Sequence, residues 1–219
     1  VKESPTFGAT SRIELTTTES ELFLDYLGES VEQVTVNGQA RDVDFDGTLI
    51  SLHELPVGEE LTIEVTGASR YSRTGQGLHR MHDQADDATY LYSHLEPSDA
   101  RRIFPCFEQP DLKAPFHVAM TAPKDWQILS NQPEIEREEH GDNATVRFAP
   151  TPPLSTYLTS FAAGPYKYQE RIWTSPDGDH SAQLRAFARA SMFEYLDEEI
   201  LELTAQGMDY FLSLIHISE

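Results

Sequence analysis

Short β-like runs separated by turn residues constrain the fold of this chain more than any other feature of its sequence. Residues 33–36 (QVTV) are rich in β-branched side chains, and Asn37-Gly38 follows them directly. Asn-Gly between two such runs is the strongest short hairpin signal, because both residues tolerate positive φ. We expect residues 41–45 to form the returning strand of this hairpin.

Further strands are predicted along most of the chain. Residues 10–16 alternate in polarity, and residues 21–26 are a mostly apolar run with Leu22, Leu24 and Tyr26 on one face. The other predicted strands are residues 48–52, 60–66, 89–95, 116–121, 127–130, 145–148, 157–162 and 182–188, whereas the Gly-, Asp- and His-rich residues 70–88 are predicted to be a loop. Strands at this spacing predict an all-β fold, either a sandwich or a barrel.

The period of the sequence changes after residue 190. Ser191 and Glu194 match a capping box, in which Ser caps a helix and Glu reaches back to it. Apolar or small residues then recur at helical spacing: Met192, Leu196, Ile200, Leu203, Gly207 and Phe211. We therefore predict a β-sandwich domain over residues 1–189 and the start of a truncated helical domain over 190–211.

Charge and cysteine content restrict the partners and the compartment. The 219 residues carry a net charge of −21, which repels phosphate backbones and anionic lipid. We therefore expect no nucleic-acid and no membrane partner. The single cysteine allows no intrachain disulfide, and no signal peptide or apolar run of about 20 residues is visible. A cytoplasmic location is the expectation.

Familiar catalytic motifs are incomplete in this sequence. The stretch 53–57 (HELPV) begins like the H-E-x-x-H zinc motif, but it ends in Val57, and Pro56 would break the required helix. None of the eight histidines has a partner at i+4. Cys106 lies in an apolar context, which is typical of an inert core thiol rather than a nucleophile. The residues alone predict an acidic β-sandwich with a helical end and no complete catalytic set.

One long segment is more specific. Residues 92–116 (YSHLEPSDARRIFPCFEQPDLKAPF) resemble the hallmark stretch of the aminopeptidase N family of gluzincin zinc metallopeptidases, and the chain is similar to actinobacterial members. The resemblance continues at 77–80 (GLHR), 126–131 (WQILSN), 153–161 (PLSTYLTSF) and 184–189 (LRAFAR). It implies the saddle-like amino-terminal β-sandwich of that family, followed by a truncated helix of the catalytic domain.

The same resemblance assigns roles to individual residues. It implies that Glu96 holds the free α-amino group of a peptide and that His94 lines the first side-chain pocket. The family often has Gln where this chain has His94, so the side-chain preference is left open. Zinc and the catalytic residues of the full-length enzyme are expected beyond residue 211, so the chain is expected to bind no metal and to be inactive by itself.

A structural role is expected for the charged residues next to Glu96. Arg101 or Arg102 is predicted to pair with Glu108 or Asp111 and to fix this loop. Gln109 departs from the Asp-Glu pair that is common in the family and removes one negative charge.

The last eight residues, 212–219 (LSLIHISE), do not resemble family sequence, and they match the translation of a common transposase sequencing adapter. We predict that they are a non-native tail; a native helix end is the alternative. Two functions remain open: the substrate-anchoring part of a zinc aminopeptidase, with peptides and the missing catalytic domain as partners, or a non-catalytic module that binds peptide amino termini. The codons after Phe211 discriminate between them.

Overall fold

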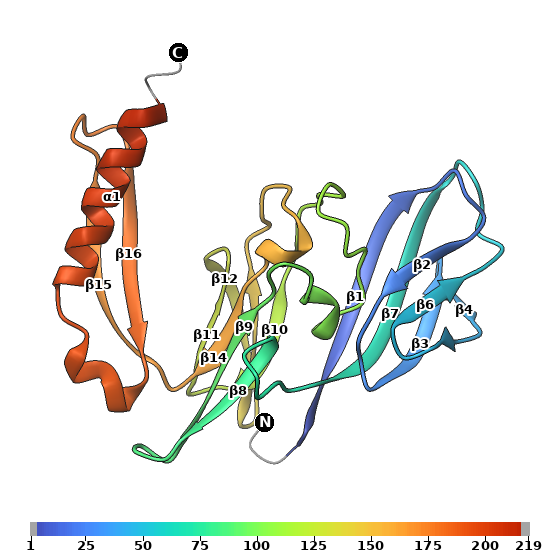
Figure 1. The fold of residues 1–219 in the computed structure, drawn as a ribbon, viewed down its shortest axis with the longest axis horizontal. Coiled ribbons are helices and arrows are strands. Elements are labelled where there is room, and N and C mark those ends of the chain that lie inside the picture. The colour runs from blue at the N-terminus through green and yellow to red at the C-terminus, as the bar shows by residue number, and fades with distance from the viewer. Residues whose placement is uncertain (1–3, 216–219) are drawn as a thin grey trace. The chain divides into compact units, whose positions relative to one another are not determined.

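The computed structural model describes residues 4–215, with only the backbone of Ile215. Sixteen strands form most of the regular structure in this part of the chain, and one α-helix follows them, as predicted (Figure 1). The chain forms two compact units: the first contains the chain up to Met81 and Leu91–Gly164, and the second contains His82–Tyr90 and the chain from Pro165 onward.

Two antiparallel sheets enclose the first core of the first unit. One sheet has the order β1 (Thr6–Thr16), β7 (Glu60–Arg70), β3 (Ser30–Val36), β4 (Gln39–Arg41). The other sheet has the order β2 (Leu22–Asp25), β6 (Leu49–Leu52), β5 (Asp44–Phe45). Strand β7 alternates between buried and half-buried side chains along most of its length, which is the pattern of a strand with one face on a core. The buried side chains include Leu24, Tyr26, Ile50, Ile63 and Val65.

The predicted Asn37-Gly38 hairpin is confirmed. Both residues have positive φ, at 51° and 76°, and Val36 pairs with Gln39 across a two-residue turn. The returning strand is β4, which ends at Arg41, earlier than predicted. Asp44 and Phe45 pair with β6 in the other sheet instead.

A second pair of sheets encloses the second core of the same unit. The larger sheet has the order β11 (Gln127–Ser130), β14 (Phe161–Gly164), β9 (Ala88–His94), β8 (Gly77–Asp83). The smaller sheet has the order β10 (Ala119–Pro123), β13 (Asn143–Phe148), β12 (Glu134–His140). Leu91, Leu95, Ile103, Trp126 and Val146 are among the buried residues between them.

Two sequence predictions in this region are wrong. Residues 70–88 were expected to be a loop but contain strand β8, whose histidines and arginine obscure the strand pattern. Residues 157–162 were expected to be one strand, but the 3-10 helix η2 (Thr156–Leu158) precedes β14 there.

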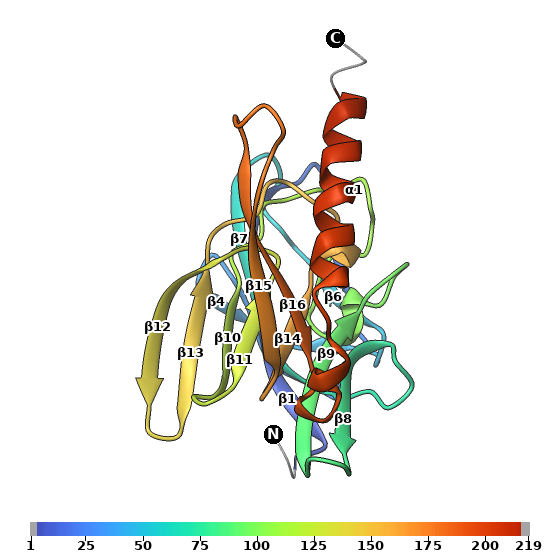
Figure 2. The ribbon, with the colours of Figure 1, turned by 90° about the vertical axis from the view of Figure 1, so that its left-hand side faces the viewer.

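The second unit is a β-hairpin covered by a helix. Strands β15 (Lys167–Thr174) and β16 (Ser181–Ala188) pair antiparallel, and helix α1 (Glu199–Ile215) contacts both strands. Figures 1 and 2 show the helix lying along this hairpin. Trp173 of β15 is 7% exposed, and its ring Nε1 donates a hydrogen bond of 2.9 Å to Asp209 of the helix.

The predicted capping box at Ser191 is wrong. Residues Ala190–Tyr195 form the 3-10 helix η3, and α1 begins only at Glu199, whose backbone N–H donates to Asp197. The Ser191 hydroxyl instead donates to the Asp83 carboxylate at 2.6 Å, which also accepts a hydrogen bond from Arg189 at 2.7 Å. Ser191 therefore donates to a carboxylate distant in sequence, and among the described residues its side chain accepts no hydrogen bond of the N-cap type.

Helix α1 has two different apolar faces. Leu201 and Ala205, each 5% exposed, lie one turn apart on the face that packs on the hairpin. The predicted stripe of Ile200, Leu203 and Phe211 is 49%, 57% and 65% exposed. The helix therefore has a partner that the sequence did not predict, while the predicted stripe is exposed. No helix in residues 4–215 is long and apolar enough to cross a membrane.

Candidate functional site

The end of strand β9 presents one row of exposed side chains. Tyr92, His94 and Glu96 are exposed, whereas Leu91 and Leu95 are buried in the second core. Successive side chains of a strand point to opposite faces, so burial of Leu91 and Leu95 directs the alternate residues outward. His94 is the last residue of β9, and Glu96 lies two residues further along, so both predicted substrate-binding residues are exposed at this end of the strand.

A tight turn follows Glu96. The Glu96–Pro97 peptide bond is cis, and the backbone N–H of Asp99 donates to the Leu95 carbonyl at 2.8 Å. The 3-10 helix η1 (Ala100–Arg102) comes next. Ala100 and Ile103 are buried in the second core. Buried residues on both sides of the turn thus hold Glu96 at the surface of the first unit.

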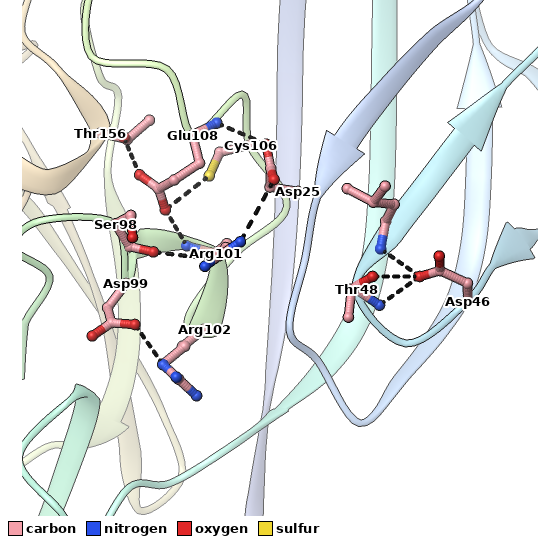
Figure 3. A network of polar contacts seen from close by, with 11 residues as sticks. Asp25, Asp46, Thr48, Ser98, Asp99, Arg101, Arg102, Cys106, Glu108 and Thr156 are labelled. Atoms are coloured by element: carbon pink, nitrogen blue, oxygen red, sulfur yellow. Dashed lines mark hydrogen bonds and ion pairs between the residues drawn. The ribbon is translucent and has the colours of Figure 1, made fainter.

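Glu108 is the centre of the polar network behind this turn (Figure 3). Its Oε2 accepts a hydrogen bond of 2.8 Å from the backbone N–H of Arg101, and its Oε1 accepts one of 2.6 Å from the Thr156 hydroxyl. Its own backbone N–H donates to Asp25 at 3.1 Å. One carboxylate therefore joins η1 to η2, the two short helices of this part of the chain.

The predicted pairing of the arginines is corrected by the structure. The Arg101 guanidinium lies 3.8 Å from the Asp25 carboxylate, and Arg102 Nε donates to Asp99 at 2.6 Å. Arg101 reaches Glu108 only through its backbone N–H. The partners Asp25 and Asp99 were missed because one is distant in sequence and the other was assigned no role.

Asp111, the other predicted acidic partner, is exposed. The backbone N–H of Lys113 donates to its carbonyl, so Asp111 belongs to a local turn. The network thus has the structural character that the sequence suggested, but with different pairs.

Position 77, in the GLHR motif, requires glycine because a side chain there would collide with Arg102. Its φ is +62°, and a Cβ atom at this position would lie 2.9 Å from Cβ of Arg102. A larger residue would therefore displace the Arg102 side chain, which lies against the start of β8.

Cys106 is a core thiol, as expected. It is 4% exposed, and its backbone exchanges two hydrogen bonds with Asp25 of β2, at 2.8 and 3.1 Å. Burial raises the pKa of the thiol, and the nearby Glu108 and Asp25 carboxylates raise it further. A thiol so resistant to ionisation is a poor nucleophile.

The WQILSN motif connects two segments of the first unit. The Asn131 side chain donates to the Leu158 carbonyl at 2.8 Å and accepts from the Ser160 N–H at 2.7 Å. Ser130 donates to the Ser160 carbonyl at 2.9 Å. The Ser-Asn pair thus fixes the chain between η2 and β14, which explains the motif without a catalytic role.

The HELPV stretch does not form a helix. His53 follows β6, Glu54 has a φ of 52°, and Leu55 is buried. The exposed His53 lies 3.1 Å from the Asp44 carboxylate, which raises the pKa of the imidazole. This geometry differs from that of a zinc-binding H-E-x-x-H helix.

Zinc does not fit the part of the chain that the structure describes. Within residues 4–215, no three His, Cys, Asp or Glu side chains come together in a group that could hold a metal ion.

His79 lies in β8 and contacts Tyr92 of β9, with ring centroids 4.9 Å apart and a tilted arrangement of the rings. This pair was not predicted, because residues 70–88 were expected to form a loop.

Comparisons with known proteins agree with this arrangement. The chain is 40% identical over 194 residues to aminopeptidase N of Streptomyces lividans, covering 87% of this chain and 22% of that protein. It is 36% identical over 149 residues to human glutamyl aminopeptidase, covering 63% of this chain and 16% of that protein. The chain thus spans about one fifth of the length of these curated relatives.

The fold is also found among solved structures. The crystal structure of Legionella pneumophila aminopeptidase A in complex with aspartic acid matches with a TM-score of 0.74 at 17% identity, covering 84% of this chain and 22% of that chain. The family model for the peptidase M1 N-terminal domain matches residues 3–158, which include Glu96, the turn after it and the Glu108 network. The chain therefore belongs to the peptidase M1 family and contains its N-terminal domain.

Proposed function

We propose that this chain is the substrate-anchoring part of a zinc aminopeptidase that releases amino-terminal residues from peptides. The observation that carries the proposal is the exposed position of Glu96, two residues after His94 at the end of β9 and held there by a turn between buried residues. The chain's membership of the peptidase M1 family and its similarity to proteins named aminopeptidases support the same proposal.

The chemistry of Glu96 suits the recognition of a free amino terminus. A carboxylate accepts charge-assisted hydrogen bonds from an ammonium group, and these are stronger than bonds between neutral groups. An internal peptide bond offers a neutral amide and no ammonium. Binding at Glu96 therefore favours the first residue of a peptide and orients the bond that follows it. His94 can donate or accept a hydrogen bond beside the first side chain.

The catalytic groups are proposed to lie outside this chain. Zinc would be held by the part of the full-length enzyme that follows Phe211, where it would supply an activated water. In the same proposal, residues 190–211 begin that catalytic domain, and residues 212–219, of which 216–219 lie outside the described residues, are foreign sequence. Peptides with a free amino terminus and the missing catalytic domain are the proposed partners, and the cytoplasm is the proposed location.

The test is Glu96→Ala in the full-length enzyme recovered from the locus. We expect kcat/KM for amino-acid anilides to fall by about 30-fold or more, the effect of roughly 2 kcal/mol or more when one partner of a charge pair is removed. Zinc content should remain unchanged. Glu59→Ala, which removes another exposed glutamate of the first unit, is the matched control and should leave turnover unchanged. Activity of Glu96→Ala within about threefold of the wild-type enzyme would refute the anchoring role.

A further inference from the structure

Tyr92 is an exposed aromatic side chain on the same face of β9 as His94, four residues before the proposed amine anchor. It is 40% exposed, although its neighbour Leu91 is buried in the second core. The ring contacts His79 of the adjacent strand β8, at a centroid distance of 4.9 Å and an interplanar angle of 41°. The Tyr92 ring is therefore partly covered by His79 and partly open to solvent, where a ligand could contact it.

The spacing of the row brings this ring within reach of a ligand at His94. Alternate residues of a strand lie about 6.6–6.8 Å apart, so Tyr92 is the next exposed side chain beside His94 on that face of β9. A ligand whose ammonium is bound at Glu96 and whose first side chain passes His94 would therefore meet Tyr92 next. A methyl group is too short to reach it, whereas a phenylalanine side chain is long enough.

We propose that Tyr92, held in place by His79, is a specificity-determining residue that contacts a large aromatic first side chain of the peptide. This inference rests on the proposed role of Glu96 as the amine anchor. An aromatic side chain would pack edge-to-face or offset against the Tyr92 ring, which is the arrangement that the π quadrupole favours. Contact with His79 restricts the Tyr92 ring before the ligand binds, which lowers the entropy cost of binding.

The experiment compares two substrates within each variant of the full-length enzyme. We measure the ratio of kcat/KM for the phenylalanine anilide to that for the alanine anilide. The ratio is internal to each preparation, so partial unfolding cancels. We expect Tyr92→Ala to lower it by about 3–10-fold, the size of one aromatic contact, while Tyr92→Phe retains it. His79→Ala should lower the ratio by a smaller factor.

Tyr168 provides a matched control. It is also 40% exposed, and its ring stacks on Phe187 at 5.2 Å and 41°, but it lies on β15 in the second unit. Tyr168→Ala should leave the ratio unchanged.

The outcomes separate the two claims. If Glu96→Ala abolishes turnover while Tyr92→Ala leaves the ratio within about twofold, the inference alone is wrong. An equal loss of the ratio in Tyr92→Ala and Tyr168→Ala would also overturn it. If Glu96→Ala leaves turnover intact, the anchoring role fails, and the inference fails with it.

Discussion

Replacing Glu108 by alanine should destabilise the first unit more than any other single carboxylate deletion in the loop after Glu96. Besides a weak hydrogen bond from the Cys106 thiol at 3.9 Å, the carboxylate accepts two short ones, from the Arg101 N–H at 2.8 Å and from the Thr156 hydroxyl at 2.6 Å. Thr156 is 5% exposed, so its hydroxyl would be left buried without this acceptor. Both donors lie in 3-10 helices that have no side-chain cap of their own.

The magnitude follows from these two bonds. A hydrogen bond to a charged group contributes about 1.5–3 kcal/mol, and Glu108 is half-buried, so we expect a total loss of about 3 kcal/mol. For a chain of this size, that loss corresponds to a decrease in Tm of roughly 6–12 °C.

The assay is urea unfolding with a probe in the first unit. Cys106 is the lone cysteine and is buried beside Glu108, so its reaction with a thiol reagent along the titration reports the unfolding of this unit. Asp111→Ala, in the same loop but exposed, is the control and should cost less than about 0.5 kcal/mol. A loss below about 0.5 kcal/mol for Glu108→Ala, or an equal loss for Asp111→Ala, would refute this account of the network.

Three further outcomes are expected. The 219-residue chain should show no turnover of amino-acid anilides and no stoichiometric zinc; chelator-sensitive turnover by the pure chain would contradict this. Light scattering should detect self-association through the exposed stripe of α1, and the double variant Leu203→Glu, Phe211→Glu should abolish it. Truncation near residue 190 should increase aggregation, because it removes the helix that covers Trp173. A strictly monomeric wild-type chain would contradict this prediction. The pKa of Asp83 is lowered, mainly by the hydrogen bond from Ser191. The ionised Asp83 carboxylate therefore stabilises the folded chain above the ordinary aspartate pKa of about 4, and this stabilisation is lost as the pH falls through the lower pKa of the folded state. Asp83→Asn should therefore flatten the acid limb of a stability–pH curve, and an unchanged limb would exclude Asp83 as its source.

Local sequence signals predicted the features that local chemistry determines. The Asn37-Gly38 turn was correct because positive φ at two successive residues restricts the sequence strongly. The burial of Cys106 followed from its apolar neighbours. His94 and Glu96 are both exposed, which leaves their predicted roles as predictions.

Features that depend on distant residues were not predictable in this way. Arg101 pairs with Asp25, 76 positions earlier, and nothing in the local pattern favours that carboxylate over Glu108. Ser191 looked like a helix cap but donates to Asp83, which lies more than 100 residues earlier in β8. The covered face of α1 was missed because the helix has apolar residues on both sides, and periodicity alone could not tell which side packs on β15 and β16.

The central claim is that Glu96 binds the amino group of the substrate. The most direct measurement is a crystal structure of the full-length enzyme with a bound amino acid. The account predicts an oxygen of the Glu96 carboxylate about 2.7–2.9 Å from the ligand ammonium nitrogen, the length of a charge-assisted hydrogen bond. A ligand ammonium held by other carboxylates, with Glu96 directed away into solvent, would contradict it.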